Sequence, residues 1–157
     1  MTREEMFMSK AIALSERNII HDEGGPFGCI VVKGDHIIGS GNNKVITNMD
    51  PTAHAEIVAI RDACKNLGSY QLDGCEIYTS CEPCPMCLGA IYWARPQIIY
   101  YANTHSDAAS AGFDDSFIYQ EINQPVNDRK IPMKNISREQ ALKVFIQWGN
   151  KTDKSIY

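Results

Sequence analysis

The chain has 157 residues, a length that suits one domain with one hydrophobic core. Apolar residues make up 44% and charged residues 22%, values ordinary for a globular protein that argue against disorder, collagen-like repeats and a coiled coil. The net charge is −4, whereas a protein built mainly to bind a phosphate backbone is usually basic. Residues 125–157 carry seven basic and three acidic side chains, so this tail keeps nucleic-acid binding open as an alternative.

Membrane and secretion signals are absent from the sequence. No apolar run approaches the roughly 18 residues that a membrane-spanning helix needs. Charged residues interrupt the first twenty positions, so these do not resemble a signal peptide. We therefore expect a cytoplasmic protein with no membrane partner. Its six cysteines are then thiols or metal ligands rather than disulfides.

The N-terminal part of the chain predicts one helix and two strands. Apolar residues recur at helical spacing over residues 2–21, with Thr2 as the N-cap. Residues 27–33 and 36–42 read as strands, and Gly34–Asp35 between them is a hairpin turn.

The middle of the chain alternates helices and strands. Residues 53–67 show the clearest helical pattern, and Gly68 follows as a stop. The apolar stripe that we expect this helix to bury consists of Ala53, Ile57, Ile60, Cys64 and Leu67. A strand is predicted over 75–80, a helix over 85–94 and a fourth strand over 97–102.

The last third of the chain is less regular. Residues 103–130 are expected to be mostly loop with short helices, and 131–136 to add an edge strand. A last helix is predicted over 137–148, capped by Ser137. This order of elements predicts an α/β protein with helices on both faces of its sheet. We expect one domain over residues 1–157, a three-layer α/β/α sandwich around a mixed sheet of about five strands.

Three side chains have the spacing of a zinc site. His54 stands at the start of the clearest helix, and Cys84 and Cys87 stand at the start of the next. Two thiolates and one imidazole leave a fourth position of tetrahedral zinc open for water, as a catalytic site requires. Helix N-termini carry partial positive charge, which favours the thiolate form. We expect one catalytic zinc ion.

Glu56 follows His54 by two residues. At about 100° per residue, His54 and Glu56 lie on opposite borders of the predicted stripe, so both can lean toward the interior. His54 can then bind the metal while Glu56 contacts the metal-bound water. A Glu56 that points into solvent would contradict this hypothesis.

The two motifs together match H-x-E…P-C-x-x-C, the signature of zinc-dependent nucleobase deaminases. At these residues the chain resembles the cytidine deaminase-like superfamily, which implies that Glu56 is the proton shuttle of a hydrolytic deamination. Cys84 and Cys87 alone could form a redox pair. A ferredoxin-like cluster with Cys81 would need a cysteine at position 91, which is Ile91. We therefore expect Cys81 to be a core thiol or a neighbour of the zinc site.

Flanking segments point to purines. Residues 50–56 resemble the purine-directed branches, tRNA adenosine deaminases among them. Residues 79–88 and 111–119 are similar to the bacterial guanine deaminases. The resemblance implies conversion of guanine and water to xanthine and ammonia. Rival hypotheses are a tRNA adenosine deaminase, a deaminase of another aminated purine or a triazine, and a non-catalytic zinc-stabilised binding module. Glu56 argues against the last, because a structural site needs no general base.

Two polar residues are candidates for substrate recognition. Guanine presents donors at N1 and at its amine, which one carboxylate can accept together, whereas adenine has an acceptor at N1. By the resemblance this carboxylate is Asp115, which would also help to move protons, with Asp114 as the fallback. Asn43 matches an asparagine that hydrogen-bonds the purine, and its amide suits the O6 and N7 edge of guanine.

The resemblance adds softer candidates. Phe27 would pack against the base, although it can equally be a core residue, and Trp93 is a further candidate for the pocket. Guanine deaminases of this type are dimers whose C-terminal segment can lie over the neighbour's active site. A homodimer is therefore expected, in which Tyr157 completes the partner's pocket unless it is a frayed terminus.

The remaining cysteines and histidines match no motif. We expect Cys29, Cys64 and Cys75 to be core residues. We expect the three histidines other than His54 to be ordinary surface residues: His21, His36 and His105.

Overall fold

The computed structural model describes residues 1–157, in which the chain separates into two units, residues 1–115 and residues 116–157. That the whole chain acts as one domain stays a prediction.

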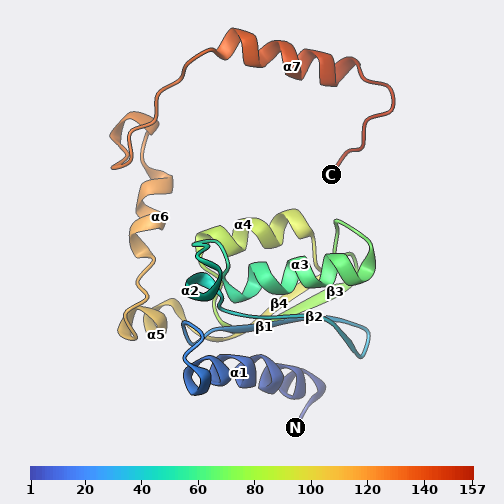
Figure 1. Ribbon diagram of the computed structural model, residues 1–157, viewed down its shortest axis with the longest axis vertical. Helices are drawn as coiled ribbons and strands as arrows, with labels where there is room; N and C mark the ends of the chain where they lie inside the picture. Colours follow the sequence, from blue (N-terminus) through green and yellow to red (C-terminus); the bar gives the residue numbers. More distant parts are fainter. The chain divides into compact units, whose positions relative to one another are not determined.

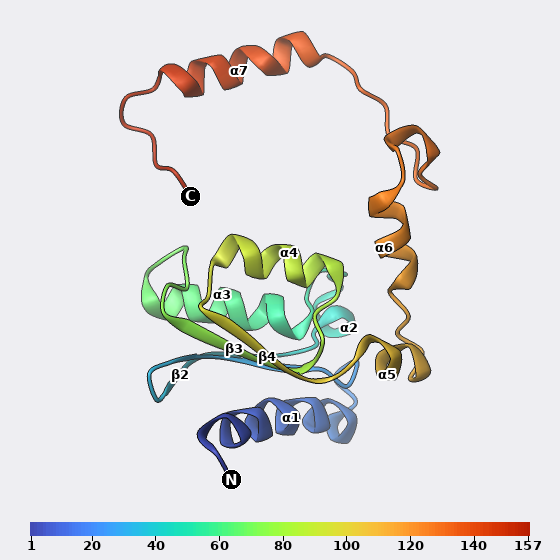
Figure 2. The same cartoon turned by 180° about the vertical axis from the view of Figure 1, so that it is seen from behind.

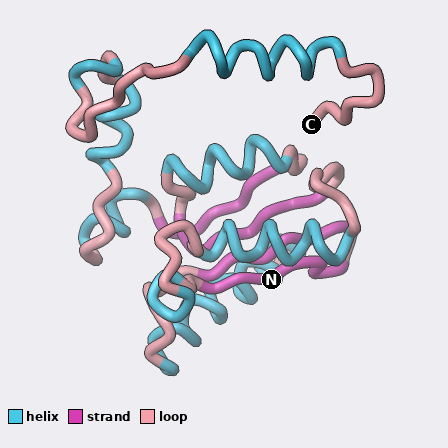
Figure 3. Tube along the Cα trace, turned by 45° about the horizontal axis from the view of Figure 1, so that its top comes forward, coloured by secondary structure: helices cyan, strands magenta, loops and turns pink.

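The first unit is built on a four-stranded sheet. Its strands follow the order β2-β1-β3-β4, in which β1 runs antiparallel to β2 and β3, while β3 and β4 are parallel. Figure 3 shows the strands of this sheet in magenta. The elements of this unit are α1 (Arg3–His21), β1 (Gly28–Lys33), β2 (His36–Asn42), α2 (Val45–Asn48), α3 (Ala55–Leu67), β3 (Cys75–Cys81), α4 (Pro85–Ala94), β4 (Ile98–Asn103) and α5 (His105–Ser110).

Helices cover both faces of this sheet. Helix α1 lies on one face, and α3 and α4 lie on the other (Figures 1 and 2). Strand β1 is buried on both sides: Ile30 and Val32 join the core under α1, and Cys29 and Val31 join the core under α3. The α/β/α sandwich is therefore confirmed, with a mixed sheet.

Local signals set several boundaries as expected. Thr2 caps α1 in a capping box with Glu5, Gly34 takes a positive φ in the hairpin turn, and Gly68 ends α3 in the left-handed conformation. Helix α2 is an addition that the sequence pattern does not predict.

The second unit departs from two expectations. It contains α6 (Ser116–Asn123), the 3-10 turn η1 (Val126–Asp128) and α7 (Arg138–Asn150). The prediction of a strand over 131–136 is wrong, so the sheet has four strands rather than about five. Pro132 lacks an N–H, and this unit holds no other strand with which the segment could pair. Ser137 adopts a left-handed conformation and makes no side-chain cap.

Apolar side chains stay exposed throughout the second unit. None of its helices contains a buried residue. The large apolar residues that are more than half exposed include Phe117, Ile122, Val144, Phe145 and Ile146. None of the chain's helices combines the length and the apolar character needed to cross a bilayer.

Helix α3 approaches strand β2 closely because glycines of the strand face alanines of the helix. A Cβ at Gly39 would stand 2.6 Å from the Ala59 carbonyl oxygen, and a Cβ at Gly41 would stand 2.3 Å from that of Ala55. The helix therefore buries its alanine face, Ala55, Ala59 and Ala63, rather than the larger predicted stripe, most of which is only half-buried. This contact fixes the start of α3 against the end of β2.

We expect Gly41→Ala to destabilise the chain by about 1–3 kcal/mol, since the added methyl meets helix backbone that must move. Urea denaturation measures the change. Gly89→Ala is the matched control: Gly89 is exposed on α4, a Cβ there would meet nothing within 4 Å, and alanine should hold or raise stability. Equal midpoints for Gly41→Ala and the original chain would contradict the close approach.

Candidate active site

The candidate site lies at one edge of the sheet. The beginning of β1 and the ends of β2, β3 and β4 meet there, because Gly28 pairs with Asn42 and Cys81 pairs with Asn103. Helices α3 and α4 both begin at this edge. Ligand sites of α/β proteins commonly form at such strand ends, where helix N-termini also converge.

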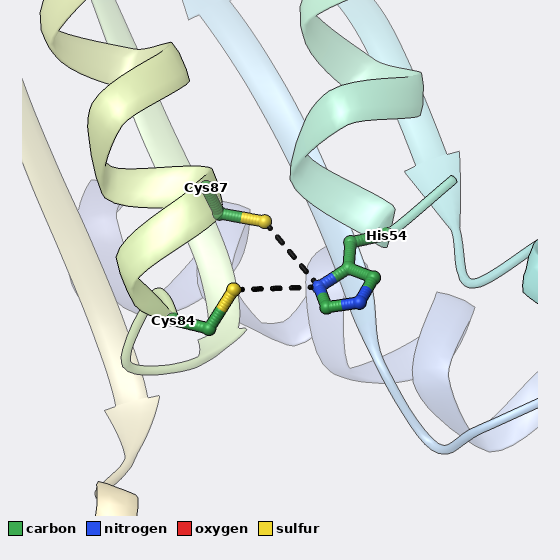
Figure 4. A group of neighbouring side chains, drawn as sticks. All are labelled: His54, Cys84 and Cys87. Atoms are coloured by element: carbon green, nitrogen blue, oxygen red, sulfur yellow. Dashed lines mark hydrogen bonds between the residues drawn. The ribbon is translucent and has the colours of Figure 1, made fainter. Parts of the chain in front are cut away.

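His54, Cys84 and Cys87 converge at this edge (Figure 4). The Nδ1 atom of His54 lies 3.5 Å from the Sγ atom of Cys84 and 3.5 Å from that of Cys87. His54 and Cys84 are the N-cap residues of α3 and α4, and both have extended backbone conformations. Their side chains therefore reach the cluster from just before each helix, whereas the residue spacing predicts that they project from a helix face. Cys87 lies in the first turn of α4 and points to the same place.

The three side chains fit zinc. Their possible ligand atoms lie within 4.8 Å of one another. Tetrahedral zinc, with bonds of about 2.1 Å to nitrogen and 2.3 Å to sulfur, separates these two ligand atoms by about 3.6 Å. The observed 3.5 Å separations agree with that value. Three protein ligands leave one coordination position open.

The electrostatics of the cluster favour a thiolate. A hydrogen bond from Cys87, assisted by His54, lowers the pKa of the Cys84 thiol to about 4. The bond with Cys84 raises the pKa of the His54 imidazole, while donation to Cys84 and burial raise the pKa of Cys87. Negative charge therefore gathers where a cation would be bound.

Glu56 is buried beside the cluster rather than exposed to solvent. Its Oε2 atom lies 3.5 Å from the Cys87 sulfur, and its Oε1 atom accepts a hydrogen bond of 3.4 Å from Thr79 on β3. Burial raises the pKa of the Glu56 carboxyl above its usual value. A raised pKa brings a carboxyl closer to the pH at which the protein works, which favours general acid–base catalysis.

Cys81 is a buried neighbour of the site outside the group of three. Its thiol contacts the Thr104 carbonyl oxygen at 3.7 Å. Burial and the nearby carboxylates of Glu56 and Asp115 raise its pKa to about 11, which keeps it a thiol. Cys29 and Cys75 are buried and Cys64 is half-buried.

Asn43 is held by its main chain. Its N–H donates to the Phe27 carbonyl oxygen at 3.1 Å, and the next N–H, that of Lys44, donates to Ala53 at 2.9 Å. Asn43 is therefore tied both to the start of β1 and to the residue before His54. Its side-chain oxygen accepts from the Val45 N–H at 3.2 Å.

Phe27 contacts the loop that carries Asp114 and Asp115. Its ring packs edge-on against Phe113, with centroids 4.9 Å apart. Gly25 permits this arrangement, because a Cβ there would stand 3.2 Å from the Phe27 ring. The half-buried Phe27 thus packs against protein as a core residue would, and a role in stacking on a base stays a prediction.

Asp115 lies beside a histidine. Its Oδ2 atom is 3.5 Å from Nδ1 of His105, and Nε2 of the same ring is 3.3 Å from Glu82. His105 was expected to be an ordinary surface histidine, and this expectation is wrong because two carboxylates flank its ring. Asp114, the fallback carboxylate, is exposed.

Residues 1–103 match the family model of the cytidine and deoxycytidylate deaminase zinc-binding region. The chain belongs to this zinc-binding deaminase family. The cofactor of the deaminase is zinc, and His54, Cys84 and Cys87 are the group in the structure that fits it.

Relatives of this deaminase match over most of its length. It is 54% identical to the guanine deaminase of Bacillus subtilis over 98% of both chains, and the crystal structure of a Bacillus subtilis guanine deaminase superposes with a TM-score of 0.94 over 98% of both chains. It is 30% identical to a tRNA-specific adenosine deaminase of Aquifex aeolicus, over 92% of this chain and 94% of that one. A guanine deaminase structure from Nitrosomonas europaea is 34% identical, with a TM-score of 0.66 over 77% of this chain and 66% of that one.

Two further candidate residues of the deaminase are largely exposed. Trp93 is 66% exposed in the last turn of α4, at the opposite end from Cys84, so the structure does not bring it to the ligands. Tyr157 belongs to the second unit and is 67% exposed. Their roles in the pocket stay predictions.

Sequence reasoning missed a polar network behind Asn43. The buried Asn18 of α1 donates to the carbonyl oxygens of Gly25 and Asn43 at 2.8 and 3.0 Å, and it accepts a hydrogen bond from Asn42. Glu23 accepts from Asn42 at 3.0 Å and pairs with Lys44 at 2.9 Å. An asparagine inside the apolar pattern of residues 2–21 was the available signal.

Proposed function

We propose that this deaminase converts guanine and water to xanthine and ammonia. The likeness to the Bacillus subtilis guanine deaminase carries this proposal, since it covers 98% of the chain at 54% identity. The buried Glu56 beside three potential zinc ligands supports the hydrolytic chemistry.

Glu56 moves the protons in this reaction. Zinc, when bound, supplies a Lewis acid that activates water for attack at neutral pH. The Glu56 carboxylate takes a proton from the attacking water and delivers it to a ring nitrogen beside C2, which makes C2 electrophilic. The oxygen adds to C2, and Glu56, assisted by Asp115, carries the second proton of the attacking water to the amine; ammonia then leaves as the C2–N bond breaks and the C2–O double bond of xanthine forms. Thr79 holds the carboxylate of Glu56 in place.

Asp115 and Asn43 select guanine in this proposal. The Asp115 carboxylate accepts hydrogen bonds from N1–H and from the exocyclic amine, and it assists proton transfer to the leaving group. The side-chain amide of Asn43 hydrogen-bonds the O6 and N7 edge of guanine. Adenine would place its N1 lone pair against Asp115 and leave the carboxylate without a donor, a mismatch that costs binding.

We further propose a homodimer in which the C-terminal segment lies over the partner's active site. The exposed apolar residues of residues 116–157 support a partner for this unit, because an isolated chain rarely leaves so many in water. Tyr157, Phe27 and Trp93 would complete the substrate pocket. The cytoplasm stays the predicted location.

A substrate panel tests the proposed function. On zinc-loaded protein we expect ammonia release from guanine to exceed that from guanosine, adenine, cytosine, cytidine, ammeline and an adenosine-containing anticodon RNA hairpin. The reason is that only guanine and guanosine in this panel offer both donors to Asp115 together with the O6 and N7 edge to Asn43, and the proposed site names no binding group for the ribose of guanosine. Light scattering of the same preparation should give the mass of two chains.

Another preference in the panel would contradict the proposal. Deamination of the RNA hairpin alone, with a steep loss of binding as salt rises, would favour a tRNA adenosine deaminase and give the basic tail its role. Preference for ammeline would place the chain among the triazine deaminases. A single-chain mass would contradict the dimer.

A further inference from the structure

The ring of His105 lies between two carboxylates, one on each ring nitrogen. Nε2 is 3.3 Å from Oε1 of Glu82, and Nδ1 is 3.5 Å from Oδ2 of Asp115. Carboxylates accept hydrogen bonds, so a ring nitrogen that carries a proton can donate to the carboxylate beside it. Glu82, His105 and Asp115 thus form one chain of polar contacts.

The first two members of this chain are anchored by the sheet. The Glu82 N–H donates to the Asn103 carbonyl oxygen at 2.8 Å, just beyond the pairing of β3 with β4. The His105 N–H donates to Oε2 of Glu82 at 3.1 Å, so both carboxylate oxygens of Glu82 face His105. Thr104 and Asp107 close a capping box around the start of α5. These hydrogen bonds hold the backbone of His105 in place.

Asp115 itself is on a loop. It follows Gly112, whose φ of +92° marks a turn, and it precedes α6. A loop carboxylate samples more than one rotamer unless a neighbour fixes it. The contact with His105 is made by Oδ2. A carboxylate has about four lone-pair positions, so Asp115 can still accept two N–H groups from a planar substrate.

We propose that His105 is a positioning residue, which holds the carboxylate of Asp115 in the orientation that accepts the N1–H and amine donors of guanine. This inference rests on the role of Asp115 in the proposed function. Glu82 acts one step further back, by orienting the His105 ring.

A matched pair of substitutions at His105 tests the contact with Asp115. The amide nitrogen of asparagine stands close to the place of histidine Nδ1, and that of glutamine stands close to the place of Nε2. His105→Asn therefore keeps a donor for Asp115, and His105→Gln keeps the donor for Glu82 only. We expect His105→Gln to lower kcat/KM for guanine roughly 10- to 100-fold. His105→Asn should retain most of the activity.

A double-mutant cycle separates positioning from general damage. In an Asp115→Asn background, His105→Gln should change kcat/KM by less than roughly twofold, because the group that it positions is already gone. His36→Ala, at an exposed histidine of the hairpin, is the control that should leave activity unchanged. Zinc content and the melting temperature are measured for each variant.

The outcomes distinguish this inference from the proposed function. If Asp115→Asn deaminates guanine at full rate, Asp115 has no role and the inference falls with it. If Asp115→Asn is impaired while His105→Gln is fully active, or if the two losses multiply, only the positioning role of His105 is overturned. Should His105→Gln fail to fold, Glu82→Gln replaces it, since that change also frees the ring and its loss should likewise vanish in the Asp115→Asn background.

Discussion

Replacing Glu56 by glutamine is expected to lower kcat for guanine by roughly 10²- to 10⁴-fold, the usual contribution of a positioned general acid–base group. The amide has nearly the same shape and can keep the contacts with Thr79 and Cys87, so the fold and the zinc site should persist. What it loses is the ability to accept a proton from water and release it to the substrate ring. Steady-state ammonia release at saturating guanine measures the loss.

Metal content and an unrelated glutamate serve as controls for this experiment. Glu56→Gln should hold the same amount of zinc as the original chain, as measured by elemental analysis. Glu16→Gln removes an exposed carboxylate of α1 and should leave kcat unchanged. Full activity of Glu56→Gln would disprove the proton-transfer role, and loss of its zinc would assign Glu56 to the metal site instead.

The elements that were predictable from the sequence are those with strong local signals. The capping box at Thr2, the glycine turn at Gly34 and the proline that begins α4 act within a few residues. The zinc cluster was predictable for a similar reason, since its two motifs both stand at helix starts. Such signals do not depend on the tertiary structure.

The errors arise where tertiary contacts decide. The larger apolar residues of α3 suggested its buried face, but Gly39 and Gly41 on β2 accept only the small Ala face. Residues 131–136 have strand-forming character in part, yet a strand exists only where a partner supplies hydrogen bonds. His105 looked isolated because no local motif links it to its partners, and Glu82 precedes it by 23 residues. A single sequence does not display such pairings.

Substitution of a zinc ligand should, like Glu56→Gln, cause a very large loss of guanine turnover. We expect Cys84→Ser to lose most of its zinc and to reduce guanine turnover by several orders of magnitude, because the Lewis acid supplies several kcal/mol of stabilisation to the transition state. Cys64→Ser is the matched control, since Cys64 is a half-buried thiol outside the cluster. It should bind zinc and turn over guanine normally.

Chelation of the original chain then decides what the metal does. The ligands do not belong to either hydrophobic core cluster: one core packs β1 and β3 against α3 and α4, and the other packs them against α1. A chelator should therefore abolish ammonia release while the circular dichroism spectrum persists, and added zinc should restore activity. Chains whose zinc is structural unfold when it is removed. Cooperative unfolding on chelation at room temperature would show that the cluster holds α3 and α4 together, and the zinc would then be structural as well as catalytic.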